Sequence, residues 1–269
     1  MIRYIVGSII MLEAALLLFP ILTAIVYGEW NTLRVFAGSA LFCIVAGALL
    51  RGKKPENTTI FSVEGYVSVA LCWVALSICG AIPLCVSGVL QNPFDAFFEI
   101  VSGFTTTGSS VMQSVEGAPR AILMWKSFSH WVGGMGVLVF LLAVIPLSGG
   151  SHINLMRAES PGPSVGKLVP KIKYTAQILY IIYFGMTIVE IVLLLISRMP
   201  AFDAITLSFG TAGTGGFGIK GDSLASYTAL QQWIVTIFMI LFGVNFNAYY
   251  LILFRKFKKA LQMEEVRAY

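Results

Sequence analysis

The stretch FTTTGSSV at residues 104–111 decides the fold, because it places Thr, Ser and Gly in the middle of an otherwise apolar chain. A related stretch, TAGTGGFG, occupies residues 211–218. The triplet Phe94-Asp95-Ala96 precedes the first stretch and recurs 108 residues later, as Phe202-Asp203-Ala204, before the second. This recurrence indicates two copies of one structural unit.

Composition places the chain in a lipid bilayer. Of its 269 residues, 57% are hydrophobic and 12% are charged, whereas soluble domains carry about a quarter charged residues. These values exclude a cytosolic enzyme, a disordered regulator and a nucleic-acid-binding domain, even though the net charge is +5. The basic excess therefore needs an explanation that involves the membrane.

Several apolar runs are long enough to span a bilayer, which requires about 20 residues. The first run is longer than the apolar part of a signal peptide and lacks a clear cleavage site, so we predict a retained helix. The six predicted spans are residues 4–27, 33–50, 63–89, 121–147, 174–197 and 230–254.

The basic residues indicate how these spans are oriented. Twelve of the 18 Lys and Arg residues fall into three clusters, each of which follows an apolar run. Because cytoplasmic loops carry the excess of Lys and Arg, we predict a multi-pass protein of the cytoplasmic (inner) membrane with both termini in the cytoplasm. The clusters are Arg51, Lys53 and Lys54; Arg157, Lys167, Lys171 and Lys173; and Arg255, Lys256, Lys258, Lys259 and Arg267.

Two further apolar stretches, at residues 93–111 and 200–218, are too short to cross and lie on the predicted outer side. That position is typical of re-entrant loops, whose irregular backbone must be buried in protein or line a water-filled cavity. Trp125 also recurs as Trp233 at the 108-residue offset. We therefore predict an all-α membrane protein, with a helix hairpin at 1–60, a helix, re-entrant loop, helix repeat at 61–150, a cytoplasmic loop at 151–173, a second repeat at 174–259 and a final segment at 260–269.

The Thr/Gly stretches have the chemistry of a potassium filter. A short helix that ends at a re-entrant loop directs the negative end of its dipole inward, and a ring of backbone carbonyl oxygens can replace the hydration shell of K⁺. We expect the carbonyls of Thr106, Thr107, Thr214 and Gly215 to bind potassium. The candidate filter residues are Thr105, Thr106, Thr107 and Gly108, and Gly213, Thr214, Gly215 and Gly216.

The alignment of the two copies leaves Gly215 and Gly216 as alternative counterparts of Gly108. Gly216 matches by the 108-residue offset, whereas Gly215 matches because it follows a Thr as Gly108 does. A simple turn is the alternative for either stretch alone. The duplication favours the filter.

Acidic residues accompany each short helix. Asp95 and Asp203 lie at the predicted helix starts, where a carboxylate such as that of Asp95 can cap free amides. Glu99, one turn later, either holds the filter by hydrogen bonds or forms a rim charge that attracts cations. Glu13 and Glu190 lie inside spans, where they are either functional groups or partners of Thr or Lys on neighbouring helices.

Other polar or small residues have a structural as well as a functional interpretation. Lys126 and His130 share one helix face, where the lysine either acts on a cation pathway or extends to the membrane surface, and the histidine is expected to pack. The glycines at 133, 134, 136 and 243, with Asn245 and Asn247, indicate close helix packing or, alternatively, a hinge. The cysteines Cys43, Cys72, Cys79 and Cys85 show no metal-binding spacing and are interpreted as small apolar fillers.

The chain resembles the membrane subunits of the Trk/Ktr/HKT superfamily of potassium transporters, and most closely the bacterial TrkH/TrkG branch. The resemblance extends over essentially the whole chain and includes the N-terminal hairpin. It rests on FTTTGSSV at 104–111, WVGGMGV at 131–137, RAESPGP at 157–163, TAGTGGFG at 211–218 and GVNFN at 243–247.

The resemblance implies a pseudo-fourfold cation channel fold in which four repeats each contribute one filter strand. Gly108 corresponds to the filter glycine of the first repeat, and Gly215 or Gly216 to that of the second. We therefore expect inward potassium movement driven by the membrane potential, with symport as the expected transport class. The resemblance also implies homodimerisation and a cytosolic nucleotide-binding regulatory subunit of the TrkA/KtrA type. Because the sequence holds two repeats and its end resembles the lead-in to a third, we expect an N-terminal fragment of such a subunit.

Two other functions are alternatives to potassium transport. A non-conducting truncated or regulatory membrane subunit is consistent with the two repeats. An intramembrane hydrolase that uses Ser109 or Ser110 with His130 lacks the GxSxG motif, so we expect no enzyme activity. We expect no cofactor, and potassium as the substrate.

Overall fold

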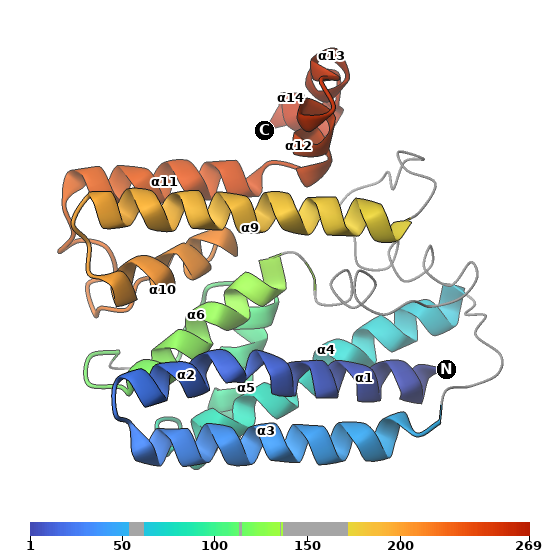
Figure 1. Ribbon diagram of the computed structural model, residues 1–269, viewed down its shortest axis with the longest axis vertical. Helices are drawn as coiled ribbons and strands as arrows, with labels where there is room; N and C mark the ends of the chain where they lie inside the picture. Colours follow the sequence, from blue (N-terminus) through green and yellow to red (C-terminus); the bar gives the residue numbers. More distant parts are fainter. Residues whose placement is uncertain (54–61, 113–114, 135, 137–171) are drawn as a thin grey trace.

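The computed structural model describes residues 1–53, 62–112, 115–134, 136 and 172–269, and the described residues contain helices and no strand (Figure 1). The RAESPGP motif, most of the predicted cytoplasmic loop, and the second half of the predicted span at 121–147 lie outside the described residues. The helices are α1 (Ile2–Leu16), α2 (Leu18–Val26), α3 (Trp30–Arg51), α4 (Ser62–Val86), α5 (Pro93–Phe104), α6 (Arg120–Gly134), α9 (Ile172–Ile196), α10 (Ala201–Ala212), α11 (Ala229–Gly243), α12 (Phe246–Leu253), α13 (Phe257–Leu261) and α14 (Glu264–Ala268).

Four of the described helical segments are long and apolar enough to cross a membrane: Ile2–Val26, Trp30–Arg51, Val63–Val86 and Gln177–Ile196. The first segment comprises α1 and α2, which meet at Leu17. Pro20 follows three residues later and has no amide proton to donate back along the helix, which accounts for the interruption. These segments agree with the first three predicted spans and the fifth.

The predicted span at 230–254 differs from the structure. The chain forms α11 and α12, and these two helices meet at an angle of 87°. Val244 is extended, and the Asn245 side chain accepts a hydrogen bond from the Asn247 amide, which starts a new helix. The predicted span is therefore bent at Gly243, Asn245 and Asn247, where a hinge was one of the two interpretations of the sequence.

The C-terminal segment packs against this bend. The Asn245 side-chain amide donates to Glu265 in α14, and the Tyr269 hydroxyl donates to the Ile240 carbonyl at 2.9 Å. A Cβ atom on Gly243 would lie 2.4 Å from the Tyr269 hydroxyl oxygen. The glycine therefore leaves the space that this contact requires.

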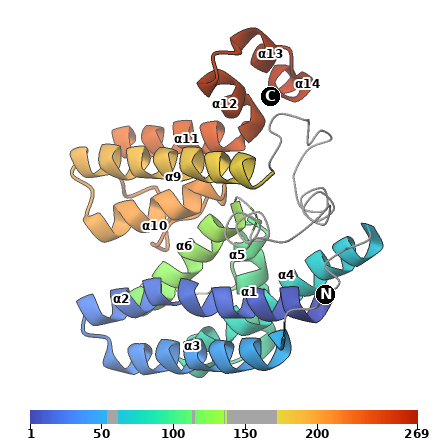
Figure 2. The same ribbon diagram turned by 45° about the vertical axis from the view of Figure 1, so that its right-hand side comes forward.

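Figures 1 and 2 show how the helices are arranged. Helices α1 and α3 lie antiparallel, α9 and α11 form a second layer, and α6 lies between the two layers. The end of α3 at Arg51, the start of α9 and the C-terminal helices are all found at one end of the bundle, together with the N-terminus. The described basic residues of the first and third clusters therefore lie at the same end.

The main core joins the hairpin to the first repeat. Trp125 is fully buried, and its indole Nε1 donates to the Gly80 carbonyl at 2.9 Å. Its counterpart Trp233 is 65% exposed. The two repeats thus have different surroundings, because the hairpin helices α1 and α2 pack against α4 and α6 of the first repeat, whereas the described helices leave Trp233 of the second repeat exposed.

The closest helix contact of the hairpin depends on two glycines. A Cβ atom on Gly7 of α1 would lie 2.4 Å from the Arg51 backbone nitrogen, and one on Gly47 of α3 would lie 2.9 Å from the Gly7 carbonyl oxygen. Small residues at both positions allow the two backbones to approach, as is typical of packed membrane helices.

We predict that Gly7→Ala destabilises the protein, while Gly38→Ala does not. Both changes gain roughly 1 kcal/mol of helix propensity, but only Gly7 lacks room, and overpacking costs about 1–3 kcal/mol. A Cβ atom added to Gly38 would meet no atom of another helix within 4 Å. Thermal unfolding in detergent should show a lower midpoint for Gly7→Ala than for Gly38→Ala, and equal midpoints would contradict the contact.

Candidate functional site

Helix α5 begins at Pro93, and Asn92 caps it by accepting a hydrogen bond from the Phe94 amide at 3.1 Å. The cap is therefore Asn92 and not Asp95 as predicted. Asp95 lies in the first turn, where its charge faces the positive end of the helix dipole. The Asn-Pro pair is a helix-start signal that would have identified this cap from the sequence.

Helix α10 begins differently. Its N-cap residue, Pro200, makes no side-chain cap. Asp203 instead accepts a hydrogen bond from the Tyr227 hydroxyl at 2.9 Å, which ties the helix start to the loop before α11. Burial raises the pKa of Tyr227, and the hydrogen bond to Asp203 raises it further, so this hydroxyl remains a donor at neutral pH.

The segments that follow α5 and α10 have the same backbone hydrogen bonds. In each, three successive amides donate back into the end of the preceding helix, and every donor and acceptor matches at an offset of 108 residues. The matched pairs are Thr105 N to Val101 O with Gly213 N to Phe209 O, Thr106 N to Gly103 O with Thr214 N to Thr211 O, and Thr107 N to Ser102 O with Gly215 N to Gly210 O.

The backbone dihedrals match at the same offset. Thr106 and Thr214 have φ of 56° and 53°, and Gly108 and Gly216 have φ of 82° and 67°. Residues with a side chain rarely adopt positive φ, so its recurrence at a Thr in both copies is a specific feature. The structure thus pairs Gly216 with Gly108 and Gly215 with Thr107.

The two segments, far apart in the sequence, are in contact. A Cβ atom on Gly108 would lie 2.1 Å from the Gly215 carbonyl oxygen. No residue other than glycine fits at Gly108 without displacing backbone. Its positive φ adds a second reason for glycine.

Helix α6 contacts and supports both units through close approaches at glycine. A Cβ on Gly103 would lie 2.1 Å from the Ser129 hydroxyl oxygen, and one on Gly133 would lie 2.2 Å from the Phe104 carbonyl oxygen. On the other side, a Cβ on Gly213 would lie 2.7 Å from the His130 carbonyl oxygen. The same helix therefore fixes the spacing of α5 and α10.

Glu99 of α5 and Lys126 of α6 form a buried ion pair, with 2.8 Å between Lys126 Nζ and Glu99 Oε1. Glu99 also accepts from the Ser110 hydroxyl at 2.9 Å and the Val111 amide at 2.9 Å, and Lys126 Nζ lies 2.7 Å from Ser110 Oγ. Glu99 is 2% exposed. It is therefore a buried group that holds the segment after Gly108 by hydrogen bonds, and the alternative of a rim charge is wrong.

Lys126 and His130 both contact the second segment through Phe217. Lys126 Nζ lies 5.1 Å from the centre of the Phe217 ring, and the His130 ring lies 4.5 Å from it. The His130 Nδ1 atom has no hydrogen-bond partner among the described residues. His130 thus packs as expected, and the described residues show no hydrogen bond from it to Ser109 or Ser110. Lys126 is buried and does not extend to the membrane surface.

Glu13 and Glu190 are fully buried, and none of their carboxylate oxygens has a hydrogen-bond partner within the described part of the chain. Thr211 of the neighbouring helix α10 nonetheless interacts with Glu190, whereas the described residues provide no Thr or Lys partner for Glu13.

A model of the family described as TrkH, cation transport protein, matches residues 32–269. The chain belongs to this family. Its members are cation transport proteins, so this chain belongs to a transporter family and not to an enzyme family. With its apolar helices, it is an integral membrane protein.

Curated relatives and a solved structure agree with this assignment. The Trk system potassium uptake protein TrkH of Salmonella typhimurium is 34% identical over 256 residues, which cover 93% of this chain and 52% of the relative. TrkG of Escherichia coli is 32% identical over 258 residues, which cover 95% and 53%. The crystal structure of the potassium transporter TrkH from Vibrio parahaemolyticus matches with a TM-score of 0.80 and 27% identity, covering 96% of this chain and 53% of that one. The chain spans about half the length of these TrkH relatives.

We predict that Glu99→Gln destabilises the protein by about 3–5 kcal/mol, because it leaves the Lys126 ammonium buried without a counter-charge. The amide oxygen of Gln can still accept from Ser110 and Val111, so the change isolates the ion pair. Chemical unfolding in detergent measures the loss.

Asp95→Asn is the matched control, since it makes the same chemical change at a partly exposed position of α5. Adding Lys126→Met to Glu99→Gln should restore part of the lost stability, because the unpaired charge disappears. Equal stability of the Glu99 and Asp95 variants would show that the ion pair does not organise the loop.

Proposed function

We propose that this chain contributes two strands of a potassium-selective filter, formed by residues 105–108 and 213–216, and acts in Trk-type potassium uptake. This proposal rests on the backbone conformation, which is the same in the two segments. Positive φ occurs at Thr106 and Gly108 but not at Thr107 between them, and the same alternation occurs at residues 214–216.

Alternation of the sign of φ turns successive peptide units the same way, so that their carbonyl oxygens face one side. Such a row of oxygens is the chemistry that replaces the water shell of K⁺. Thr106 and Thr107 in one segment, and Thr214 and Gly215 in the other, are the residues whose carbonyls we assign to ion binding. The C-terminal ends of α5 and α10 add the negative ends of their dipoles.

The direction and driving force follow from elementary electrostatics. A cation that moves inward through a potential of 100 mV releases about 2.3 kcal/mol, so uptake requires no chemistry in this chain. Two strands do not surround an ion. We therefore propose that these two belong to a ring of four, as in the pseudo-fourfold fold that the family resemblance implied.

We also propose the orientation and partners of the chain. The basic residues Arg51 and Lys53 and those after Arg255 lie at one end of the bundle, which supports a cytoplasmic position for that end and for both termini. The matched relatives are named as members of the Trk system. As the family resemblance implies, we propose an assembly of two such membrane subunits with a cytosolic nucleotide-binding subunit.

We predict that Gly108→Ser and Gly216→Ser each lower the preference for potassium over sodium by roughly tenfold, because both alter a carbonyl row that must fit K⁺. Because two strands do not surround an ion, the ratio of rubidium to sodium uptake is measured in liposomes that contain a complete four-repeat form bearing this chain's residues. Gly117→Ser is the control, since Gly117 also has positive φ but has open space and lies outside the segments. Unchanged ratios in the two filter variants would refute the filter assignment.

A second candidate is a non-conducting or regulatory membrane subunit, because the two described segments do not by themselves surround an ion. Liposomes with the wild-type chain separate the two functions. Uptake of rubidium above that of protein-free liposomes supports conduction, whereas its absence, with the chain correctly folded and inserted, supports the second candidate.

A further inference from the structure

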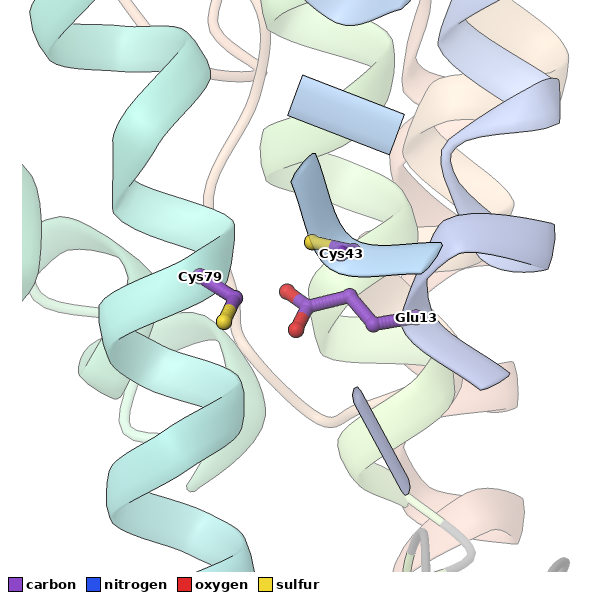
Figure 3. Close-up of side chains that lie close together, drawn as sticks. All are labelled: Glu13, Cys43 and Cys79. Atoms are coloured by element: carbon purple, nitrogen blue, oxygen red, sulfur yellow. The ribbon is translucent and has the colours of Figure 1, made fainter. Parts of the chain in front are cut away.

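We propose that Glu13, Cys43 and Cys79 form a buried binding site for a thiophilic divalent cation, of which Zn²⁺ is the best match. The site lies apart from the two filter segments and is independent of the proposed transport function. Figure 3 shows the Glu13 carboxylate between the two cysteine side chains.

The three side chains come from three helices. Glu13 belongs to α1, Cys43 to α3 and Cys79 to α4, and their ligand atoms all lie within 4.8 Å of one another. Their exposed fractions are 0%, 0% and 6%. Both cysteines are free thiols.

The Glu13 carboxylate is the observation that points to a ligand. Neither of its oxygens has a hydrogen-bond partner among the described residues, although both are buried. A buried carboxyl group without a partner is costly, and buried charges in proteins are normally paired or bound to metals. A cation at the centre of the three side chains would satisfy this carboxylate.

The donor set and its spacing fit zinc. Zinc is bound by thiolate sulfur at about 2.3 Å and carboxylate oxygen at about 2.0–2.2 Å. Tetrahedral ligands at these distances lie about 3–4 Å from one another, so only a small contraction of the observed group is required. Binding releases the protons of the two thiols and of the carboxyl group, so the three ligands carry one negative charge more than the cation, and a water molecule would fill the fourth tetrahedral position.

Gly80, next to Cys79 on α4, makes room for the carboxylate. A Cβ atom there would lie 2.8 Å from Glu13 Oε1. The sequence did not reveal this group, because its three members are far apart in the chain and lack the short spacing of common zinc motifs. The interpretation of Cys43 and Cys79 as apolar fillers is the one that this proposal replaces.

Bound metal would link the N-terminal hairpin to the first repeat, since α1 and α3 belong to the hairpin and α4 begins the repeat. We therefore expect bound metal to stabilise the protein against unfolding. The gain in stability is set by the affinity of the folded state for the metal and by the metal concentration.

The test uses the purified 269-residue chain in detergent under reducing conditions. After removal of metal with a chelator, it is loaded with Zn²⁺, freed of excess and analysed by elemental mass spectrometry. We expect about one zinc per chain and a rise in the unfolding temperature on loading. Cobalt in place of zinc should give a thiolate-to-metal charge-transfer band.

The variants Cys43→Ala, Cys79→Ala and Glu13→Gln should each bind zinc at least about tenfold more weakly. Cys85→Ala is the matched control, because Cys85 lies on the same helix as Cys79 but outside the group. If an alanine variant does not fold, zinc binding by the Cys43→Ser or Cys79→Ser variant and the cobalt spectrum of the wild type show whether the thiols bind the metal.

Three results would overturn the proposal. They are a wild-type chain that retains no zinc, zinc binding that is equal in the Cys43, Cys79 and Cys85 variants, and a Cys43–Cys79 disulfide that mass spectrometry detects in the freshly isolated, unreduced chain. The first would leave a neutral carboxyl group packed against two thiols.

Discussion

The buried ion pair between Glu99 and Lys126 organises the first re-entrant unit. Each charge would be costly alone at this depth, so the pair can exist only if α5 and α6 are held at one separation. The Glu99 carboxylate also accepts hydrogen bonds from the Ser110 hydroxyl and the Val111 amide. The segment after Gly108 thereby has a fixed position relative to both helices.

The second unit has no such pair and depends on the first. The residues at the 108-residue offset from Glu99 and Lys126 are Leu207 and Ile234, which cannot form an ion pair. Instead, the second segment packs against α6, with Phe217 against His130 and Lys126. One helix therefore supports both segments, which brings Gly108 into contact with Gly215 although the surrounding side chains differ.

Both copies nevertheless share one backbone conformation. Inside a membrane, the polar groups of irregular backbone must be satisfied by protein. Here the end of each short helix accepts three amides from the segment that follows it. This arrangement stabilises the positive φ of Thr106 and Thr214 without requiring the same side chains around them.

The sequence alone determined the membrane location, the long apolar helices, the two short helices and the duplication, because hydropathy and repetition are properties of the linear chain. It did not determine the pairing of Gly108 with Gly216, since the residue types support either alignment and only the backbone hydrogen bonds and dihedral angles distinguish the two. Nor did it determine the bend before α12, which depends on an Asn cap. The contacts among Glu99, Lys126 and Ser110, and the meeting of Glu13 with two cysteines, were decided only by the tertiary structure, because helix packing brings together residues that no local spacing connects.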